Sequence, residues 1–231
     1  MKILHTSDWH LGKTLENISR IDEQRQFIDE LCDIADREQI DLLLLAGDVF
    51  DTYNPSSAAE ELFYEAIDRL NNKGQRALVI IAGNHDSPDR LCAASPLAYK
   101  NGVILLGYPG SDAGEYKTEG SGIHILQSGK GWLELKLPQY EYSSVILSMP
   151  YPSESRLEEV LSKEGDSDRL QEVYSQRIGA ILQELSSHFR EDTVNLVISH
   201  LFMREGKVSD SERQLGGAMM VEPEAIPEKA H

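Results

Sequence analysis

Apolar and polar residues follow each other in blocks along the chain, and the blocks have two different periods. The runs at 41–46 (DLLLLA) and 77–82 (ALVIIA) are almost unbroken and apolar, as in short strands that are buried on both faces. Over 20–38 and 57–72, apolar residues recur every three or four positions, as on helices with one buried face. Strands that alternate with helices predict an α/β fold with a parallel sheet.

The pattern changes near the middle of the chain. Strands are predicted at 2–6 and 103–107, and a loop rich in Gly, Ser and Asp follows at 107–122. Short β-like runs come after the loop, which favours antiparallel pairing or a second sheet. One α/β domain with two packed sheets fits this order better than two domains. The later elements are strands at 123–126, 132–137 and 145–149, a helix at 168–189 and a strand at 194–199.

Helix boundaries carry signals of their own. Ser57 and Glu60 have the spacing of a capping box that opens the second helix, and Gly74 is placed to end it. Ser87 followed by Pro88 predicts another helix start, because serine caps a helix and proline fits its first turn.

Polar motifs directly follow four of the predicted strands. In open α/β sheets, ligands bind beyond the carboxyl ends of the strands, so these motifs should gather at one edge. Each motif alone is weak, since a lone D-x-H arises by chance and GD after a strand is more often a turn. Their shared position at strand ends carries the prediction. The motifs are Asp8-Trp9-His10, Gly47-Asp48, Gly83-Asn84-His85-Asp86 and Ser199-His200.

These side chains suit a site for divalent metal ions. Asp8 and His10 are separated by one residue, so on an extended backbone they would point to the same side and share one ion. Asp48 offers a carboxylate that can bridge two ions, while Asn84 offers an amide oxygen and His200 an imidazole. This mixture of ligands favours Mn²⁺, Fe²⁺ or Zn²⁺ over Ca²⁺. The glycines before Asp48 and Asn84 let the chain turn sharply toward the metal.

Composition limits the kinds of function that the chain can have. The chain has 231 residues, 40% of them hydrophobic, which is enough for one large domain. Its net charge of −17 argues against an ordinary nucleic-acid binder, whose footprint is a basic patch. The objection weakens if part of this negative charge holds divalent cations, which invert the local electrostatics. A partner would then supply the basic surface.

The sequence predicts neither a membrane protein nor a secreted one. No apolar run approaches the ~20 residues that span a bilayer, and the opening MKILHTSDWH lacks the features of a signal peptide. The two cysteines, Cys32 and Cys92, form neither a disulfide framework nor a CxxC pair. We therefore expect a cytoplasmic protein.

Taken together, the four motifs resemble the signature of the calcineurin-like metallophosphoesterases. The opening MKILHTSDWHLGK and the segments LLLLAGDVFD, IIAGNHDSPDR and SHLFMREG are similar to one subfamily, the SbcD-type DNA nucleases that work with an SbcC-type ATPase. The resemblance extends over essentially the whole chain. It implies a four-layer metallophosphoesterase sandwich, in which two mixed β-sheets are flanked by helices.

The resemblance also implies a role for each residue of the motifs. Two divalent ions, most simply Mn²⁺, would be bound, and Asp48 would bridge them. His85 matches the family's catalytic histidine, and Asp86 would orient its imidazole. The remaining ligands would be Asp8 and His10 for one ion, and Asn84 and His200 for the other.

The activity that the resemblance implies is that of a manganese-dependent nuclease in DNA repair, recombination and replication. It would cut double strands as an exonuclease and single strands or hairpins as an endonuclease. Family members pair through helices that correspond to 57–72 and 88–99, so a homodimer is expected. The family's final Gly-His-x-His motif does not occur before His231. We therefore expect residues 1–231 to be a truncated nuclease domain without the capping domain and the ATPase-binding tail.

Two other functions stay open. A small-molecule phosphodiesterase of the same superfamily would use the same metal ligands. A non-catalytic scaffold for an ATPase partner is the second alternative, because two ligands of the family's set are missing. A protein phosphatase is disfavoured, since GDVFDTYN has no arginine close behind the GD motif to hold phosphate.

Overall fold

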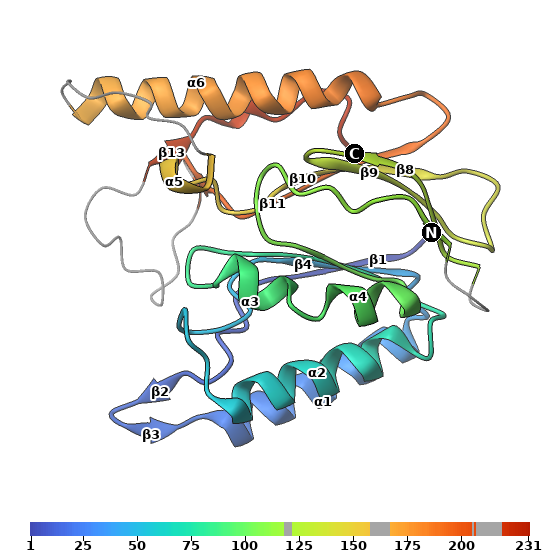
Figure 1. Ribbon diagram of the computed structural model, residues 1–231, viewed down its shortest axis with the longest axis vertical. Coiled ribbons are helices and arrows are strands. Elements are labelled where there is room, and N and C mark those ends of the chain that lie inside the picture. Colours follow the sequence, from blue (N-terminus) through green and yellow to red (C-terminus); the bar gives the residue numbers. More distant parts are fainter. Residues whose placement is uncertain (118–121, 158–166, 205, 207–218) are drawn as a thin grey trace.

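Two β-sheets face each other in the centre of the molecule, with helices on the outer side of each (Figure 1). Helices α1 (Ile21–Arg37) and α2 (Ser57–Asn71) cover one sheet, and α6 (Ser167–Leu185) covers the other. The α/β class that the sequence predicts is therefore confirmed. The architecture is that of a computed structural model, which describes residues 1–117, 122–157, 167–204, 206 and 219–231.

The first sheet is entirely parallel. Its connections run over the helical side, where α1, α2 and the short helices α3 (Pro88–Cys92) and α4 (Ser95–Ala98) lie. Because the strands are parallel, their carboxyl ends meet at one edge of the sheet. The order is β1-β4-β5-β6, with bounds Ile3–Thr6, Leu42–Ala46, Ala77–Ile81 and Val103–Leu106.

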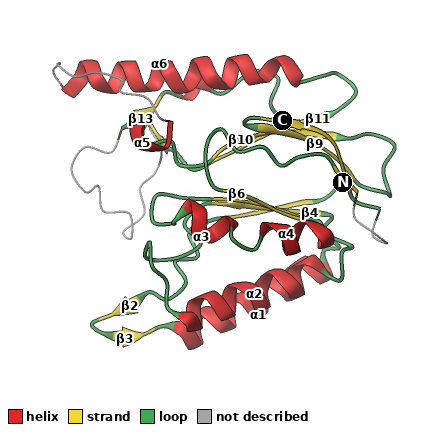
Figure 2. Ribbon diagram, viewed as in Figure 1, coloured by secondary structure: helices red, strands yellow, loops and turns green. Residues whose placement is uncertain are grey.

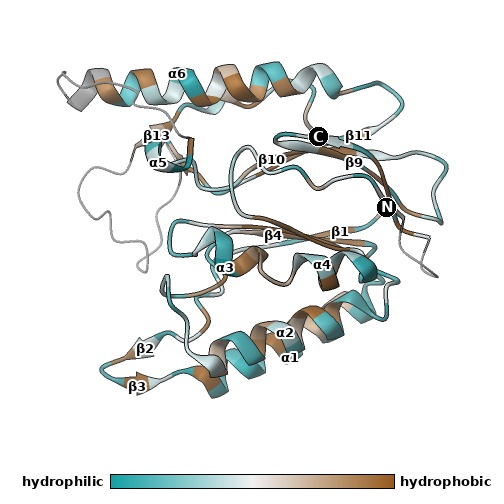
Figure 3. Ribbon diagram, in the orientation of Figure 1, coloured by the Kyte–Doolittle hydropathy of each residue, from teal (hydrophilic) through white to brown (hydrophobic). Residues whose placement is uncertain are grey.

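Alternate residues of the buried strands face two different layers. In β4, Leu43 and Leu45 pack against the helices, whereas Leu42 and Leu44 pack against the second sheet. Every residue of β4 and β5 is buried, and Figure 3 shows the sheet at β4 in the brown of hydrophobic residues. Burial of a leucine-sized side chain contributes about 1.5–3 kcal/mol, so both strands contribute strongly to stability. This rigid layer carries the loops described below.

The second sheet, of which Figure 2 labels β9, β10 and β11, has both parallel and antiparallel pairs of strands. Its order is β11-β10-β9-β8-β7, in which β10 (Ser144–Met149) and β11 (Val194–Ser199) run parallel. The other pairs are antiparallel, which confirms the expected change of pairing in the second half of the chain. The bounds of these strands are Tyr116–Lys117 for β7, His124–Gly129 for β8 and Trp132–Lys136 for β9.

Short elements connect the larger ones. The expected helix near 88–99 is divided between α3, α4 and the start of η1, and Pro96 lies at the start of α4, where its missing N–H is tolerated. The β2–β3 hairpin projects beyond the end of α1 (Figure 1). The bounds are Thr14–Leu15 (β2), Ile18–Ser19 (β3), Tyr99–Asn101 (η1), Glu154–Leu157 (α5), Ser186–His188 (η2), Phe202–Met203 (β12), Met220–Val221 (β13) and Pro223–Ala225 (η3).

The helix boundaries differ in detail from the prediction. Ser56 caps α2 in place of Ser57, because Ser56 has the extended backbone that a cap needs and its hydroxyl accepts a first-turn amide at 3.3 Å. The helix ends at Asn72, whose φ of 49° is left-handed, before Gly74 is reached. The prediction at Ser87 is confirmed, since its hydroxyl accepts an amide of the α3 first turn.

Both cysteines are free thiols packed in the first half of the fold. Burial raises the pKa of Cys32, and it raises the pKa of Cys92 to about 11, so both stay protonated at neutral pH. Among the residues that the structure describes, every helix is too short or too polar to span a lipid bilayer.

Candidate metal centre

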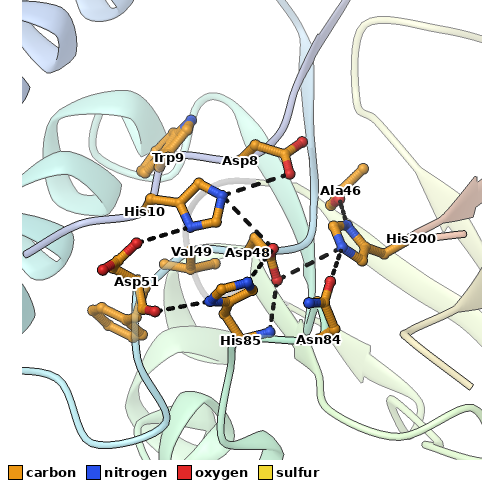
Figure 4. Close-up of polar contacts among 12 residues, drawn as sticks. Asp8, Trp9, His10, Ala46, Asp48, Val49, Asp51, Asn84, His85 and His200 are labelled. Carbon is orange, nitrogen blue, oxygen red and sulfur yellow. Dashed lines mark hydrogen bonds and ion pairs between the residues drawn. The ribbon is translucent and has the colours of Figure 1, made fainter. Parts of the chain in front are cut away.

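The loops after β1, β4, β5 and β11 meet at one edge of the molecule. Backbone hydrogen bonds join the first two loops, from the Asp8 amide to the Gly47 carbonyl and from the His10 amide to the Asp48 carbonyl, both at 3.0 Å. The His200 amide bonds the Met149 carbonyl at 3.1 Å, which ties the end of β11 to the end of β10. Figure 4 shows the side chains that this edge brings together: Asp8, His10, Asp48, Asn84, His85 and His200, with Asp51 beside them.

Asp8 and His10 approach each other by a different route from the expected one. Their φ angles are 57° and 45°, so both residues are left-handed and the extended geometry assumed from their spacing is wrong. The turn still brings His10 Nε2 to 3.9 Å from Asp8 Oδ1. Asp48 is also left-handed, with a φ of 50°. Each such residue costs about 1–2 kcal/mol, and strain of this kind concentrates at functional sites.

Asp48 lies at the centre of the cluster and is almost completely buried, with 3% of its surface exposed. Its Oδ1 accepts the His85 amide at 2.9 Å and lies 3.6 Å from His200 Nε2. Its Oδ2 lies 3.7 Å from His10 Nε2 and 4.0 Å from His85 Nε2. The two oxygens of one carboxylate therefore face different groups of ligand atoms, as a bridging ligand requires.

Two glycines allow this crowding. A Cβ on Gly83 would lie 2.2 Å from the Asp48 backbone nitrogen, and a Cβ on Gly47 would lie 2.4 Å from His200 Nδ1. No side chain fits at such distances. Gly47 also has a φ of 86°, which glycine adopts without strain. At Gly83 the Asp48 backbone comes too close for a side chain. At Gly47 the His200 ring comes too close, and the chain also needs a left-handed turn, so both motifs begin with glycine.

His200 supplies the sharpest sign that a cation belongs here. Its Nδ1 lies 2.8 Å from the Ala46 carbonyl oxygen, which can only accept, so Nδ1 carries the hydrogen. In the neutral imidazole, Nε2 then has a lone pair, which is directed at Asn84 Oδ1 at 2.9 Å. Asp48 Oδ1 is 3.6 Å from the same nitrogen. With the imidazole neutral, three atoms with lone pairs thus converge with no hydrogen between them, and a divalent cation would satisfy all three.

A second group of ligand atoms forms around His10. One ligand atom each from Asp8, His10 and Asp48 lies within 4.8 Å of the other two. His10 Nδ1, on the far side of the ring, is 3.4 Å from Asp51 Oδ1 and makes no hydrogen bond of good geometry. A carboxylate behind a metal-binding imidazole is a recurrent arrangement that orients the ring. Two carboxylates and an imidazole fit a divalent transition metal.

His85 faces the same space from the β5 side. Its Nδ1 lies 2.8 Å from the Asp51 carbonyl oxygen, so this nitrogen carries a hydrogen and Nε2 is left facing the site. Its ring meets the His10 ring edge to face, with centroids 4.9 Å apart. The side chain is 41% exposed, which leaves room for contact with a bound molecule.

Asp86 does not orient His85, so that expectation is wrong. Its Oδ2 accepts the Gly83 amide at 2.8 Å and the Val49 amide at 3.1 Å, and its Oδ1 accepts the Phe50 amide at 2.9 Å. Consecutive residues of the loop point in different directions, and Asp86 points into the protein, where it is fully buried. Burial raises the pKa of Asp86, while the three amides oppose that shift. Asp86 joins the β4 loop to the β5 loop.

Asp51 is a residue of this site that lies outside the four sequence motifs. Its carboxylate contacts His10 and its carbonyl contacts His85, so it supports two imidazoles at once. His10, Asp51 and His85 also form a second set of atoms with the spacing of metal ligands. The available signal was the acidic residue three positions after Asp48 in GDVFD. Its spacing matches no general ligand pattern, and only the fold brings it to the two rings.

The fold and this site define the class of protein. A family model described as Calcineurin-like phosphoesterase matches residues 1–216, and the chain belongs to this family. The family predicted from the four motifs is thereby confirmed.

Two curated relatives make the resemblance more specific. The SbcD component of nuclease SbcCD from Bacillus subtilis is 44% identical over 232 residues, which cover 100% of this chain and 54% of the relative. The protein of the same name from Staphylococcus epidermidis is 31% identical over 215 residues, 93% of this chain and 50% of that relative. The chain is thus similar to SbcD and spans about half the length of these relatives.

Proposed function

We propose that this chain is the catalytic part of a nuclease that hydrolyses DNA phosphodiester bonds with two divalent cations, most simply Mn²⁺. The observation that carries the proposal is the convergence of lone-pair atoms on both oxygens of Asp48. The names of the two relatives support the choice of substrate class, since both are components of a nuclease. The four-layer sandwich of the family agrees with the order of helices and sheets in Figure 1.

Each ion would have its own set of ligands around the shared carboxylate of Asp48. Asp8 and His10 would hold one ion, and Asn84 and His200 the other. Cations held there would supply positive charge to a phosphodiester and would lower the pKa of a water molecule. They would also offset the negative charge of the chain where the substrate binds.

His85 would act on the substrate directly. With Nδ1 held by the Asp51 carbonyl, Nε2 is the nitrogen that can exchange a proton in the site. When protonated, it would donate to the sugar oxygen that leaves as the P–O bond breaks, or to the charge that develops on the phosphate. Its exposure supports this role, because a buried imidazole could not reach a DNA strand.

The assembly is also part of the proposal. By resemblance to SbcD, the chain would work in the cytoplasm with an SbcC-type ATPase in DNA repair and recombination, and residues 1–231 would form its nuclease domain. A homodimer through the segments at 57–72 and 88–99 is supported by exposed apolar residues there, Tyr64 at 43% and Leu97 at 70%. The chain's net charge of −17 leaves a basic DNA-binding surface for a partner to provide.

The test combines metal binding with cleavage. Calorimetric titration with Mn²⁺ should find two sites in the wild type and in His85→Gln, and none in Asp48→Asn, because the Asp48 carboxylate faces both sites. Linear DNA with Mn²⁺ should be cut by the wild type but not by either variant. Asp33→Asn, an exposed carboxylate on α1, is the matched control and should behave as the wild type.

The other outcomes separate the alternatives. Cleavage of a nitrophenyl phosphodiester without cleavage of DNA would favour a small-molecule phosphodiesterase. Absence of Mn²⁺ binding at millimolar concentration would favour a non-catalytic scaffold. Normal cleavage of DNA by His85→Gln would show that the role given to His85 is wrong.

A further inference from the structure

A guanidinium from the second half of the chain holds both ends of the loop that carries Asn84 and His85. Arg156, on α5, donates from Nη1 to the Gly83 carbonyl at 2.8 Å and from Nη2 to the Asp86 carbonyl at 2.7 Å. The two acceptors flank Asn84 and His85 in the sequence. One planar group therefore fixes the separation of the two carbonyls on either side of these residues.

Two amides of the same loop are bound by carboxylates, one of them within the loop and one on the β4 side. The Gly83 amide donates to Asp86 Oδ2, and the His85 amide donates to Asp48 Oδ1. The amides are thus bound by carboxylates of the first half of the fold, and the carbonyls by Arg156 of the second half. Together these contacts hold both kinds of polar group in the loop's backbone.

Arg156 is itself held in place. Its guanidinium carbon lies 5.6 Å from the centroid of the Tyr151 ring, and the Tyr151 amide donates to the Ala82 carbonyl at 2.9 Å. The segment between β10 and α5 is therefore attached to the chain immediately before the loop. A cation over an aromatic face is favourable, and it limits the orientations that the guanidinium can take.

We propose that Arg156 is a positioning residue, which sets the loop at 83–86 so that Asn84 Oδ1 and His85 Nε2 face the metal centre. Lysine cannot replace it fully, because one ammonium is a point donor while the guanidinium reaches two carbonyls with a fixed spacing. The positioning itself rests on geometry alone. Only its consequence for cleavage rests on the proposed function.

The first test is amide hydrogen exchange in the metal-free full chain. Loss of two hydrogen bonds should speed exchange of the Gly83 and His85 amides by about tenfold or more in Arg156→Gln, and by less in Arg156→Lys. Exchange in β4 should stay unchanged in both variants, which reports that the fold is intact. Arg37→Gln, an exposed arginine on α1, is the matched control and should leave the loop unchanged.

The second test measures kcat and KM for DNA cleavage separately. If Arg156 acts through the loop, kcat for Mn²⁺-dependent DNA cleavage should fall while KM for DNA stays within about threefold, because ground-state contacts are kept. Arg156→Lys should recover part of kcat. Free guanidinium should restore part of it in Arg156→Ala.

The other possible results of these two tests lead to different conclusions. Unchanged exchange at the loop would overturn the proposal, whatever the activity. Unchanged exchange with a raised KM would instead make Arg156 a phosphate contact, which also overturns it. Faster exchange in a chain whose wild type cuts no DNA would uphold the positioning and refute the proposed function alone.

Discussion

The two sheets contribute unequally to the candidate metal centre. The parallel sheet of the first half delivers Asp8, His10, Asp48, Asn84 and His85, whereas the mixed sheet delivers His200. The reason is the direction in which the strands of each sheet run. Every strand of a parallel sheet ends at the same edge, but in a mixed sheet only strands of one direction do so.

The exception in the second sheet supports this explanation. β10 and β11 run parallel, and both end at the site: His200 follows β11, and the segment after β10 leads to Tyr151 and Arg156. β7 and β9 run in the opposite direction and contribute no residue to the described part of the centre. β8 runs in the direction of β10, but β9 separates the two strands in the sheet, and β8 contributes no such residue either. A ligand in this fold therefore comes from a strand whose end faces the edge, whichever half of the chain it belongs to.

The largest effect on the centre is expected from Gly83→Ala. The new Cβ would collide with the Asp48 backbone, so the loops after β4 and β5 must separate and both ions should be lost. Overpacking of this kind typically costs about 1–3 kcal/mol of stability. Chemical denaturation and Mn²⁺ titration measure the two effects. Gly110→Ala is the control, since nothing lies within 4 Å of its Cβ position; similar behaviour of the two variants would contradict the argument.

A smaller effect should distinguish the two halves of the site. His10→Ala should remove the ion held with Asp8, and His200→Ala should remove the ion held with Asn84, while each leaves the other ion bound. Calorimetry should therefore count one Mn²⁺ in each variant. Loss of both ions in His200→Ala would mean that the ligands from the parallel sheet cannot bind their own ion without the ligand from the mixed sheet.

The smallest effect on the centre is expected from a variant in the mixed sheet. Both Nη atoms of Arg190 donate hydrogen bonds to the carboxylate of Glu134 on β9, at 2.6 Å and 3.1 Å. The Ser143 hydroxyl donates to the same carboxylate. Glu134→Gln should cost about 1.5–3 kcal/mol of stability, the usual value for hydrogen bonds to a charged group. Mn²⁺ binding should not change. A clear loss of metal would show that the second sheet supports the centre more directly.

The same variant has a defined pH dependence. The hydrogen bonds from Arg190 lower the pKa of Glu134 in the folded protein below its ordinary value. The carboxylate therefore contributes stability above the unfolded pKa of about 4.3, and that contribution is lost as the pH falls through the folded pKa. The Tm difference between the wild type and Glu134→Gln should be full at neutral pH and should shrink below about pH 4. A constant difference would exclude this cause.

Local sequence was sufficient for the elements and for the gathering of most site residues. Periodicity alone locates β4, β5, α1 and α2, because burial on one or two faces leaves a pattern within a few residues. The parallel order then brings the polar strand ends to one edge, as observed for Asp8, Asp48, Asn84 and His200. Motifs at the ends of predicted strands are thus a sound guide to which side chains meet.

The tertiary structure decided which atoms face which. The left-handed turn at Asp8 and His10, the inward direction of Asp86 and the support from Asp51 depend on loops that contact each other across the sheet. Arg156 reaches the site from 70 residues further along the chain than Asp86. Side-chain direction follows from backbone angles that such distant contacts impose, and these contacts leave no periodic trace in the sequence.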